Sequence, residues 1–258
     1  MMVLVVEMLL ILPSTTLVLS NSYNVGTGPL WSLLESRPDL STTHESWPGM
    51  ALVFLVHWAS LASIRPFMYG AAGVFDVLWY CNVSLLLSTI ACLASIPALM
   101  AATVCSLFVV HLGFTIDVLM YGMKGDVVAG VFGTDLITHQ DSNLLDYYTT
   151  SHHVWYMPVC LWWLREVDYK WDYDALYMSI IIAVVLLTVT RLLTPKQIEG
   201  KLLNINIVYD PPVPGLKKWF ENNLKEPWRS IVYVAILIVM MSMVSALTFC
   251  CLRYMFLC

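Results

Sequence analysis

Apolar residues gather in long runs separated by polar stretches, and this pattern predicts membrane-spanning helices. The clearest run covers residues 230–252 and holds no charged side chain. With a rise of 1.5 Å per residue, a helix of this length extends about 34 Å, which is enough to cross a hydrocarbon core of roughly 30 Å. The run is apolar on every face, so we expect lipid to surround it.

Six further runs approach the same pattern. We therefore predict an all-α fold, a polytopic transmembrane helical bundle of about seven spans. The first run carries Glu7 and Pro13 and lacks a basic start, which favours an uncleaved helix. If it is instead a cleaved signal, six spans remain. The predicted spans cover residues 2–19, 50–64, 71–95, 98–121, 149–164, 175–193 and 230–252.

Polar and proline-rich stretches divide the chain into five predicted parts. Residues 1–19 form a signal anchor or first transmembrane helix, and 20–48 an extracytoplasmic loop. A transmembrane core of five helices occupies 49–194, with a tight turn at Pro97 that makes the spans at 71–95 and 98–121 a hairpin. A cytoplasmic loop at 195–229 and a final transmembrane helix at 230–258 complete the chain.

Lys and Arg predict the orientation, because they concentrate in cytoplasmic loops. With the 194–229 loop in the cytoplasm, alternation through seven spans places nine of the 13 basic residues on that side and four on the other. The amino terminus is then inside and the carboxyl terminus outside. The nine are Arg65, Lys124, Arg191, Lys196, Lys201, Lys217, Lys218, Lys225 and Arg229.

Composition supports a multi-pass membrane location and leaves the organelle open. Hydrophobic residues make up 59% of the chain and charged residues 12%, compared with roughly half and a quarter in soluble domains. The net charge of −5 argues against nucleic acid as a partner. Membrane lipids, and other membrane subunits, are the expected partners. The seven cysteines form no C-x-x-C pair, so we interpret them as small core residues.

Ionisable side chains within apolar runs are the candidates for chemistry, because each costs roughly 2.5–3.5 kcal/mol at membrane depth and needs a partner or a purpose. Topology brings four of them to similar depth near the cytoplasmic leaflet. These four, Asp76, Asp117, His152 and His153, are the predicted catalytic residues. Two further histidines, His57 and His111, lie deeper in their runs.

Carboxylates and imidazoles that converge from several helices can hold zinc and activate a water molecule. The predicted ligands are Asp76, His111, His152 and His153. The same residue types can act as a general acid and base on a lipid headgroup. We therefore expect a lipid-directed hydrolase or transferase, with zinc as a possible cofactor.

Three alternatives remain open at this stage. The chain can be a structural or assembly subunit without catalysis, whose small and aromatic residues pack against partner helices. It can be a transporter or a proton relay, which uses the same residue types. The carboxylates can also be structural, with Asp76 and Asp117 at helix ends paired with Arg65 or Lys124. Whether the chain is an enzyme is thus undecided by the sequence.

The 194–229 loop carries two further features. Asn204-Ile205-Asn206, followed by Pro211 and Pro212, predicts an ordered segment whose amides bond to the backbone. Residues 216–224 alternate apolar residues with lysines over two turns. They predict either an interfacial helix on an anionic leaflet or a solvated connector.

Several of these motifs occur together in a recognisable order: Asp76-Val-Leu-Trp79-Tyr80-Cys81-Asn82, Ser151-His152-His153-Val-Trp155-Tyr-Met-Pro158, an Asp-Tyr-Asp-Ala run from Asp172, and Asn204-Ile-Asn206. The set resembles a group of uncharacterised, mostly bacterial polytopic integral membrane proteins with D-x-x-W-Y-C-N, S-x-x-H and N-I-N motifs. The resemblance covers about residues 70–210 and implies a shared fold without a known activity. The chain differs in its His–Pro spacing and in Ile207, where the group has Trp.

Seven spans with scattered Asp and His are also similar to the alkaline ceramidase and progestin-receptor-like superfamily of zinc-dependent lipid amidases. That resemblance implies zinc and a lipid substrate. The family carries a His-x-x-x-His pair on its last helix, whereas residues 230–252 contain no histidine.

Overall fold

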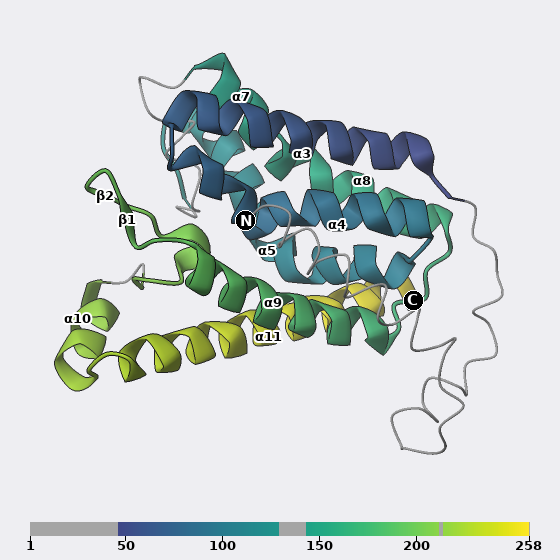
Figure 1. Cartoon of the computed structure of the whole chain (residues 1–258). Coiled ribbons are helices and arrows are strands. Elements are labelled where there is room, and N and C mark those ends of the chain that lie inside the picture. Colours follow the sequence, from purple (N-terminus) through teal and green to yellow (C-terminus); the bar gives the residue numbers. More distant parts are fainter. Residues whose placement is uncertain (1–45, 129–142, 212–213, 258) are drawn as a thin grey trace, which may run out of the picture. The chain divides into compact units, whose positions relative to one another are not determined.

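The computed structural model describes residues 46–128, 143–211 and 214–257, and helices dominate these residues (Figure 1). The prediction of an all-α fold is confirmed. The predicted first span, residues 2–19, lies outside the described residues. The elements are α3 (Pro48–Tyr69), η1 (Gly73–Leu78), α4 (Tyr80–Ala94), α5 (Pro97–Lys124), α7 (Leu144–Thr150), α8 (His152–Glu166), α9 (Tyr173–Leu193), β1 (Gln197–Ile198), β2 (Lys201–Leu202), η2 (Ile205–Ile207), α10 (Pro214–Asn223) and α11 (Trp228–Leu257).

Four helices of the described residues are long and apolar enough to cross a membrane: α3, α5, α9 and α11. They contain 22, 28, 21 and 30 residues, and a crossing needs about 20. These helices are what an integral membrane protein requires. The described residues do not support the prediction of about seven spans.

Two predicted spans are shorter than a crossing. The run at 71–95 is not one helix, because a 3-10 helix, η1, precedes α4 and the chain turns to an extended conformation at Trp79. Helix α4 then has only 15 residues. The run at 149–164 forms α8, which also has 15 residues and ends with Arg165 and Glu166. Periodicity could not show the break at Trp79, since apolar residues continue on both sides of it.

Local sequence explains where the helices begin and end. Pro48 and Pro97 open α3 and α5, where a missing N–H group costs nothing. Asn143 caps α7 in a capping box with Asp146, and the Asp172 side chain accepts a hydrogen bond from the backbone of α9. The short interval between α4 and α5 produces the predicted hairpin, and these two helices pack against each other.

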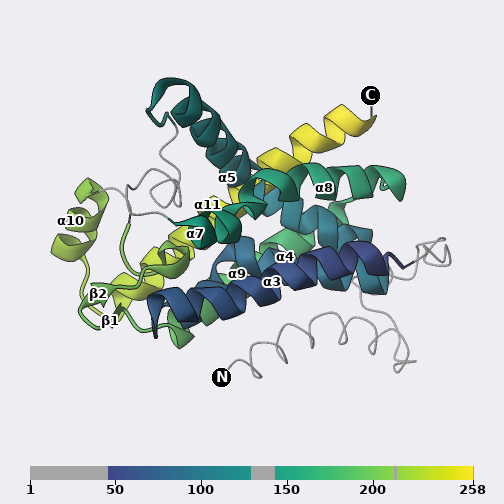
Figure 2. The ribbon, with the colours of Figure 1, turned by 90° about the horizontal axis from the view of Figure 1, so that it is seen from above.

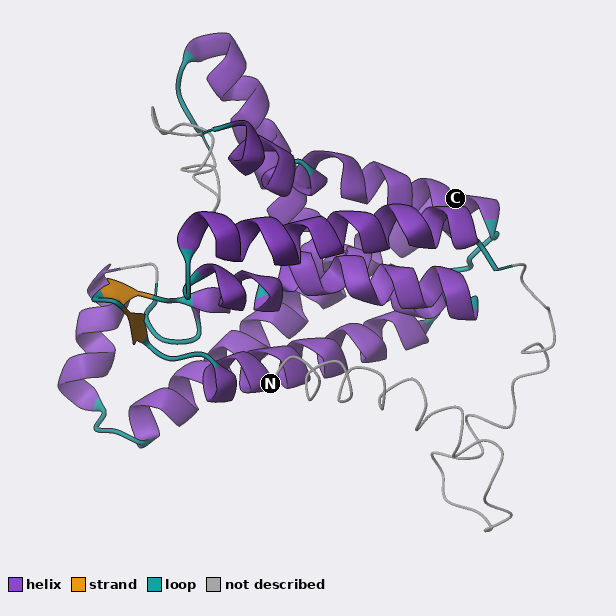
Figure 3. Ribbon diagram, turned by 45° about the horizontal axis from the view of Figure 1, so that its top comes forward, coloured by secondary structure: helices purple, strands orange, loops and turns teal. Residues whose placement is uncertain are grey.

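Helix α5 is the centre of the packing and contacts α4, α8, α9 and α11 (Figure 2). Its residues Leu99 to Leu107 are all buried, so the helix is enclosed by protein over more than two turns. Helix α3 lies along α4 and also contacts η1 and α7 (Figure 3). In contrast, most of α11 faces outward: only 17% of its most apolar stretch is buried, and its exposed side chains are large and apolar, as expected for a helix in lipid.

A close backbone approach fixes η1 against α3. A Cβ atom at Gly73 would lie 2.1 Å from the carbonyl oxygen of Arg65. Only glycine therefore permits this contact. The approach brings Asp76, on η1, next to the Arg65 side chain of α3.

Candidate functional site

Four histidines from three helices meet in the interior. His57 comes from α3, His111 from α5, and His152 and His153 open α8. The His57 ring centroid lies 5.2 Å from that of His152, which lies 4.4 Å from that of His153. His111 and His153 are stacked with 4.8 Å between centroids. The sequence predicted three of these histidines as ligands, and the structure brings those three together.

These histidines are buried, and several of their nitrogens have no hydrogen-bond partner within the described part of the chain. The exposed fractions run from 1% for His111 and His152 to 8% for His153. Each unsatisfied buried polar atom costs about 1–3 kcal/mol, so such a concentration in one place points to a ligand. The atoms are His57 Nε2, His111 Nδ1 and Nε2, His152 Nε2 and His153 Nδ1.

His152 is held in an orientation that suits metal binding. Its Nδ1 lies 3.0 Å from the carbonyl oxygen of Thr149. A carbonyl can only accept, so Nδ1 carries the proton and the lone pair of the neutral ring lies on Nε2. This arrangement, with one ring nitrogen bonded to a backbone carbonyl and the other free, is the usual one for a metal-ligating histidine.

Cys81 completes a group of three possible ligands. One ligand atom each from Cys81, His152 and His153 lies within 4.8 Å of the others. The interpretation of all cysteines as core residues missed this role. Cys81 lies in the D-x-x-W-Y-C-N motif, and that motif was the available signal. His111 lies against the group through its stack on His153 and is not one of the three.

The position of Cys81 follows from the break between η1 and α4. Cys81 is the second residue of α4, directly after the extended residue Trp79 and Tyr80. Asn82 Nδ2 donates to the Asp76 carbonyl oxygen at 2.6 Å and ties the first turn of α4 back to η1. The Cys81 thiol donates to Asn82 Oδ1 at 3.6 Å.

Asp76, a predicted ligand and catalytic residue, pairs with Arg65 instead. Its Oδ2 lies 3.8 Å from Arg65 Nη1, and both side chains are largely buried. Burial raises the pKa of Asp76 to about 6, against the opposing effects of Arg65 and of a hydrogen bond from Trp79. The sequence left this pairing with Arg65 open as an alternative to catalysis, in which Asp76 has a structural role. Asp76 is not part of the three-ligand group.

Asp117, the other predicted catalytic carboxylate, lies further along α5. It is fully buried, and its Oδ1 accepts a hydrogen bond from the backbone N–H of Val128 at 2.9 Å. This bond joins the end of α5 to the chain that follows it. Asp117 is likewise absent from the three-ligand group.

Hydroxyl groups fill the space beside the histidines. The Tyr156 ring centroid is 5.4 Å from that of His111, and its hydroxyl lies 2.7 Å from Ser88 Oγ and 2.8 Å from Thr103 Oγ1. These side chains come from α8, α4 and α5. These hydrogen bonds satisfy the Tyr156 hydroxyl within the protein, so the Tyr156 side chain is held in a fixed position beside the histidines.

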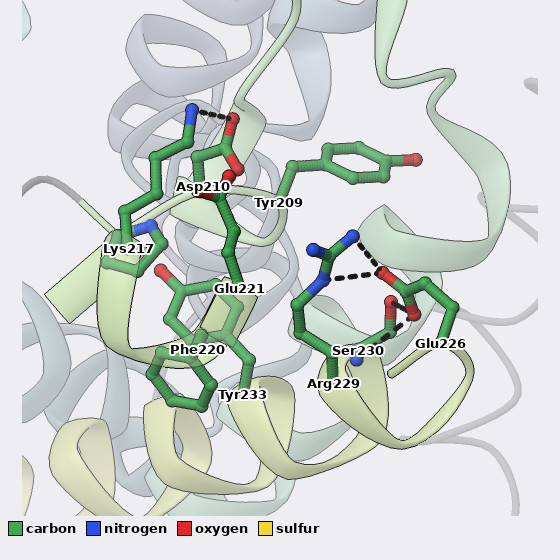
Figure 4. Close-up of a pocket in the computed structure, with 10 residues that line it drawn as sticks. Tyr209, Asp210, Lys217, Phe220, Glu221, Glu226, Arg229, Ser230 and Tyr233 are labelled. Atoms are coloured by element: carbon green, nitrogen blue, oxygen red, sulfur yellow. Dashed lines mark hydrogen bonds and ion pairs between the residues drawn. The ribbon is translucent and has the colours of Figure 1, made fainter. Parts of the chain in front are cut away.

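A separate small pocket, with a volume of about 20 Å³, lies between α10 and the start of α11 (Figure 4). Its charges pair with one another: Lys217 Nζ lies 3.2 Å from Asp210, and Arg229 Nη2 lies 2.9 Å from Glu226. The hydrogen bond from Ser230 holds the pKa of Glu226 below its usual value, and Arg229 adds to this effect. The pairs stabilise the corner, and the pocket has room for little more than one water molecule.

The comparisons with known proteins found no family model, no curated protein and no solved structure that matches this chain. Function is therefore inferred from the residues themselves. They give apolar helices compatible with an integral membrane protein and, in its interior, a group formed by Cys81, His152 and His153.

Proposed function

We propose that this protein is a membrane-embedded hydrolase or transferase that acts on lipids, with zinc bound by Cys81, His152 and His153. The observation that carries the proposal is the convergence of three donor atoms within 4.8 Å of one another. Cysteine sulfur and imidazole nitrogen are the donors that zinc prefers. Binding would also satisfy His152 Nε2 and His153 Nδ1, which are buried without a partner in the described residues.

Three protein ligands are typical of catalytic zinc sites, which keep a fourth position for water or substrate. A bound zinc ion would supply Lewis acidity and a water molecule of lowered pKa. His111 stacks on the His153 ring, and both its ring nitrogens are without a hydrogen-bond partner among the described residues. It would be the nearest further imidazole to the proposed site.

The membrane setting supports a lipid substrate. The site lies beside α3 and α5, which are apolar enough to cross a bilayer, so lipids are the substrates nearest to it. The chemical class is a lipid with a hydrolysable ester or amide bond, whose carbonyl carbon is the electrophile that a metal-bound water would attack.

The test is the zinc content of the purified full-length protein in detergent, measured by elemental analysis. We expect about one zinc per chain, and loss of that zinc in the Cys81→Ala and His152→Ala variants. Cys92→Ala is the matched control, because Cys92 is buried on the same helix, α4. Equal zinc contents in the wild type and the Cys81→Ala variant would contradict the proposal.

One observation favours a second mechanism for the same reaction class. Cys81 stands in the first turn of α4 with imidazoles beside it. Burial raises the pKa of its thiol to about 12, so the thiol needs one of these imidazoles as its base. In this mechanism the thiol passes its proton to His152 or His153, and sulfur attacks the acyl carbonyl. The lipid alcohol or amine leaves with that proton, and water or an acceptor alcohol then releases the acyl group from sulfur.

A Cys81→Asp variant separates the two mechanisms. Aspartate can still bind zinc but cannot form a thioester, so the zinc mechanism predicts retained zinc and reduced but measurable turnover of an acyl lipid. The thiol mechanism predicts complete loss of turnover and, in the wild type, a hydroxylamine-sensitive acyl group on the peptide that contains Cys81. Detection of that acyl group would decide for the thiol.

A further inference from the structure

The loop after α9 reaches the beginning of α4 through one side chain, that of Asn206. Asn206 Oδ1 accepts a hydrogen bond from the backbone N–H of Tyr80 at 2.8 Å. Asn206 Nδ2 donates to the carbonyl oxygen of Leu78 at 2.7 Å and to Thr190 Oγ1 at 3.0 Å. All three bonds are buried. One amide thus connects η1, α4 and α9.

The beginning of α4 needs this amide because its own sequence supplies no cap. The first N–H groups of a helix have no partner within the helix, and Trp79, at the N-cap position, makes no capping bond through its side chain. Tyr80 is the first residue of α4, and Leu78 is the last of η1. Asn206 therefore bridges both sides of the break at Trp79.

The loop that carries Asn206 is itself fixed. Asn206 has φ of 50°, in the left-handed region, which asparagine tolerates better than most residues. Asn204 closes the loop by accepting from the backbone N–H of Tyr209 at 2.9 Å and donating to the Asp210 carbonyl at 2.7 Å. The Tyr233 hydroxyl of α11 donates to the Ile207 carbonyl at 2.7 Å. Asn206 is thus presented from a rigid support.

We propose that Asn206 is a positioning residue that holds Cys81 against His152 and His153. This inference rests on the proposed function of the Cys81 group. Cys81 directly follows Tyr80, so the bridge that Asn206 makes from the Leu78 carbonyl to Tyr80 N–H fixes the turn from which the thiol projects. Asn204 and Asn206 then have different roles. Asn204 holds the conformation of the loop, and Asn206 connects that loop to the first turn of α4, which carries Cys81.

The experiment compares Asn206→Ala, Asn206→Asp and the matched control Asn204→Ala in the full-length protein in detergent. Two properties are measured: zinc affinity, by competition with a chelator, and the rate at which a maleimide alkylates Cys81 without zinc, by mass spectrometry of its peptide. The alkylation of buried Cys92, on the same helix, is the internal reference for general loosening.

We expect Asn206→Ala to lower zinc affinity about 10- to 100-fold, as loss of a supporting partner of a metal ligand does. Alkylation of Cys81 should accelerate about fivefold or more relative to Cys92, because the first turn of α4 opens locally. Asn204→Ala should change both properties clearly less than Asn206→Ala does, because the bond from the Tyr233 hydroxyl to Ile207 still supports the loop, even where thermal stability falls. Equal effects of Asn204→Ala and Asn206→Ala would overturn the proposal.

Asn206→Asp tests the positioning role if the Asn206→Ala variant does not fold. It retains an acceptor for Tyr80 N–H and loses the donor to Leu78 and Thr190, so we expect changes in the same direction as for alanine. Wild-type values of both properties in this variant would overturn the positioning role. If the wild type binds no zinc, the proposed metal function fails, whereas the alkylation rates still test the position of Cys81.

Discussion

The imidazole of His111 lies parallel to that of His153, with 3° between the ring planes and 4.8 Å between the centroids. This stack joins α5, the helix at the centre of the packing, to the first turn of α8. It holds the His111 ring against a proposed zinc ligand and leaves both His111 nitrogens without a hydrogen-bond partner among the described residues.

The first prediction concerns His111→Phe, which keeps the stack and removes two unsatisfied polar atoms. Since each such atom costs about 1–3 kcal/mol, we expect the metal-free variant to be more stable than wild type by about 1 kcal/mol or more. Thermal unfolding in detergent with a chelator measures this difference. Zinc content should persist, because Cys81, His152 and His153 remain; its loss would make His111 a fourth ligand.

The second prediction tests the contact between η1 and α3. Gly73→Ala places a Cβ atom 2.1 Å from Arg65 O, so the backbone must move apart, and we expect a loss of about 2 kcal/mol or more. Gly49→Ala is the control, because nothing lies within 4 Å of its Cβ position in the first turn of α3. Equal unfolding temperatures for the two variants would contradict the close approach.

The third prediction follows from the raised pKa of Asp76. Burial raises this pKa to about 6 from an ordinary value of 3.8, so the folded state binds the proton more tightly than the unfolded state. The resulting stabilisation, at most about 3 kcal/mol, is fully present below about pH 4 and is lost as the pH rises through about 6.

The Asp76→Asn variant lacks this titration. Between pH 4 and pH 6.5, the unfolding temperature of the wild type, measured with a chelator, should therefore fall relative to that of the variant. A constant difference across this range would show that Asp76 does not titrate there, and a difference that changes in the opposite direction would mean that Arg65 lowers its pKa.

The fourth prediction concerns the hydroxyl network beside the site. Tyr156→Phe removes the partner of Ser88 and one partner of Thr103, both buried, and should cost about 1–3 kcal/mol. Tyr177→Phe, at an exposed position on α9, should change stability by less than about 0.5 kcal/mol. Comparison of their unfolding temperatures checks this, and a neutral Tyr156→Phe would show that the hydroxyl does not stabilise the fold.

Helices with long apolar runs could be predicted from the sequence. The predicted spans at 50–64, 98–121, 175–193 and 230–252 each lie within a helix of the structure, namely α3, α5, α9 and α11. Length and apolar character determine such helices almost alone in a membrane. The turn at Pro97 also follows from local chemistry, since proline starts a helix more readily than it continues one.

The break at Trp79 could not be predicted from local pattern, because the residue that caps α4, Asn206, lies far along the chain. Cys81 stands in the D-x-x-W-Y-C-N motif, but its closeness to His152 and His153 depends on how α4 and α8 lie in the fold. The convergence of His111, His152 and His153 was anticipated because buried imidazoles need a purpose. Asp76 was assigned to the same site because it was predicted to lie at a similar depth in the membrane. Depth does not determine which side chain a carboxylate contacts, and in the structure Asp76 pairs with Arg65.

The bond between Asn206 and Tyr80 spans 126 positions of the chain. Because synthesis proceeds from the amino terminus, the ribosome must complete α9 and the following loop before α4 receives its cap. The four histidines and Cys81 are therefore all synthesised before the residue that caps α4. If Asn206 positions Cys81 as proposed, the group formed by Cys81, His152 and His153 reaches its final geometry only after that loop has been made.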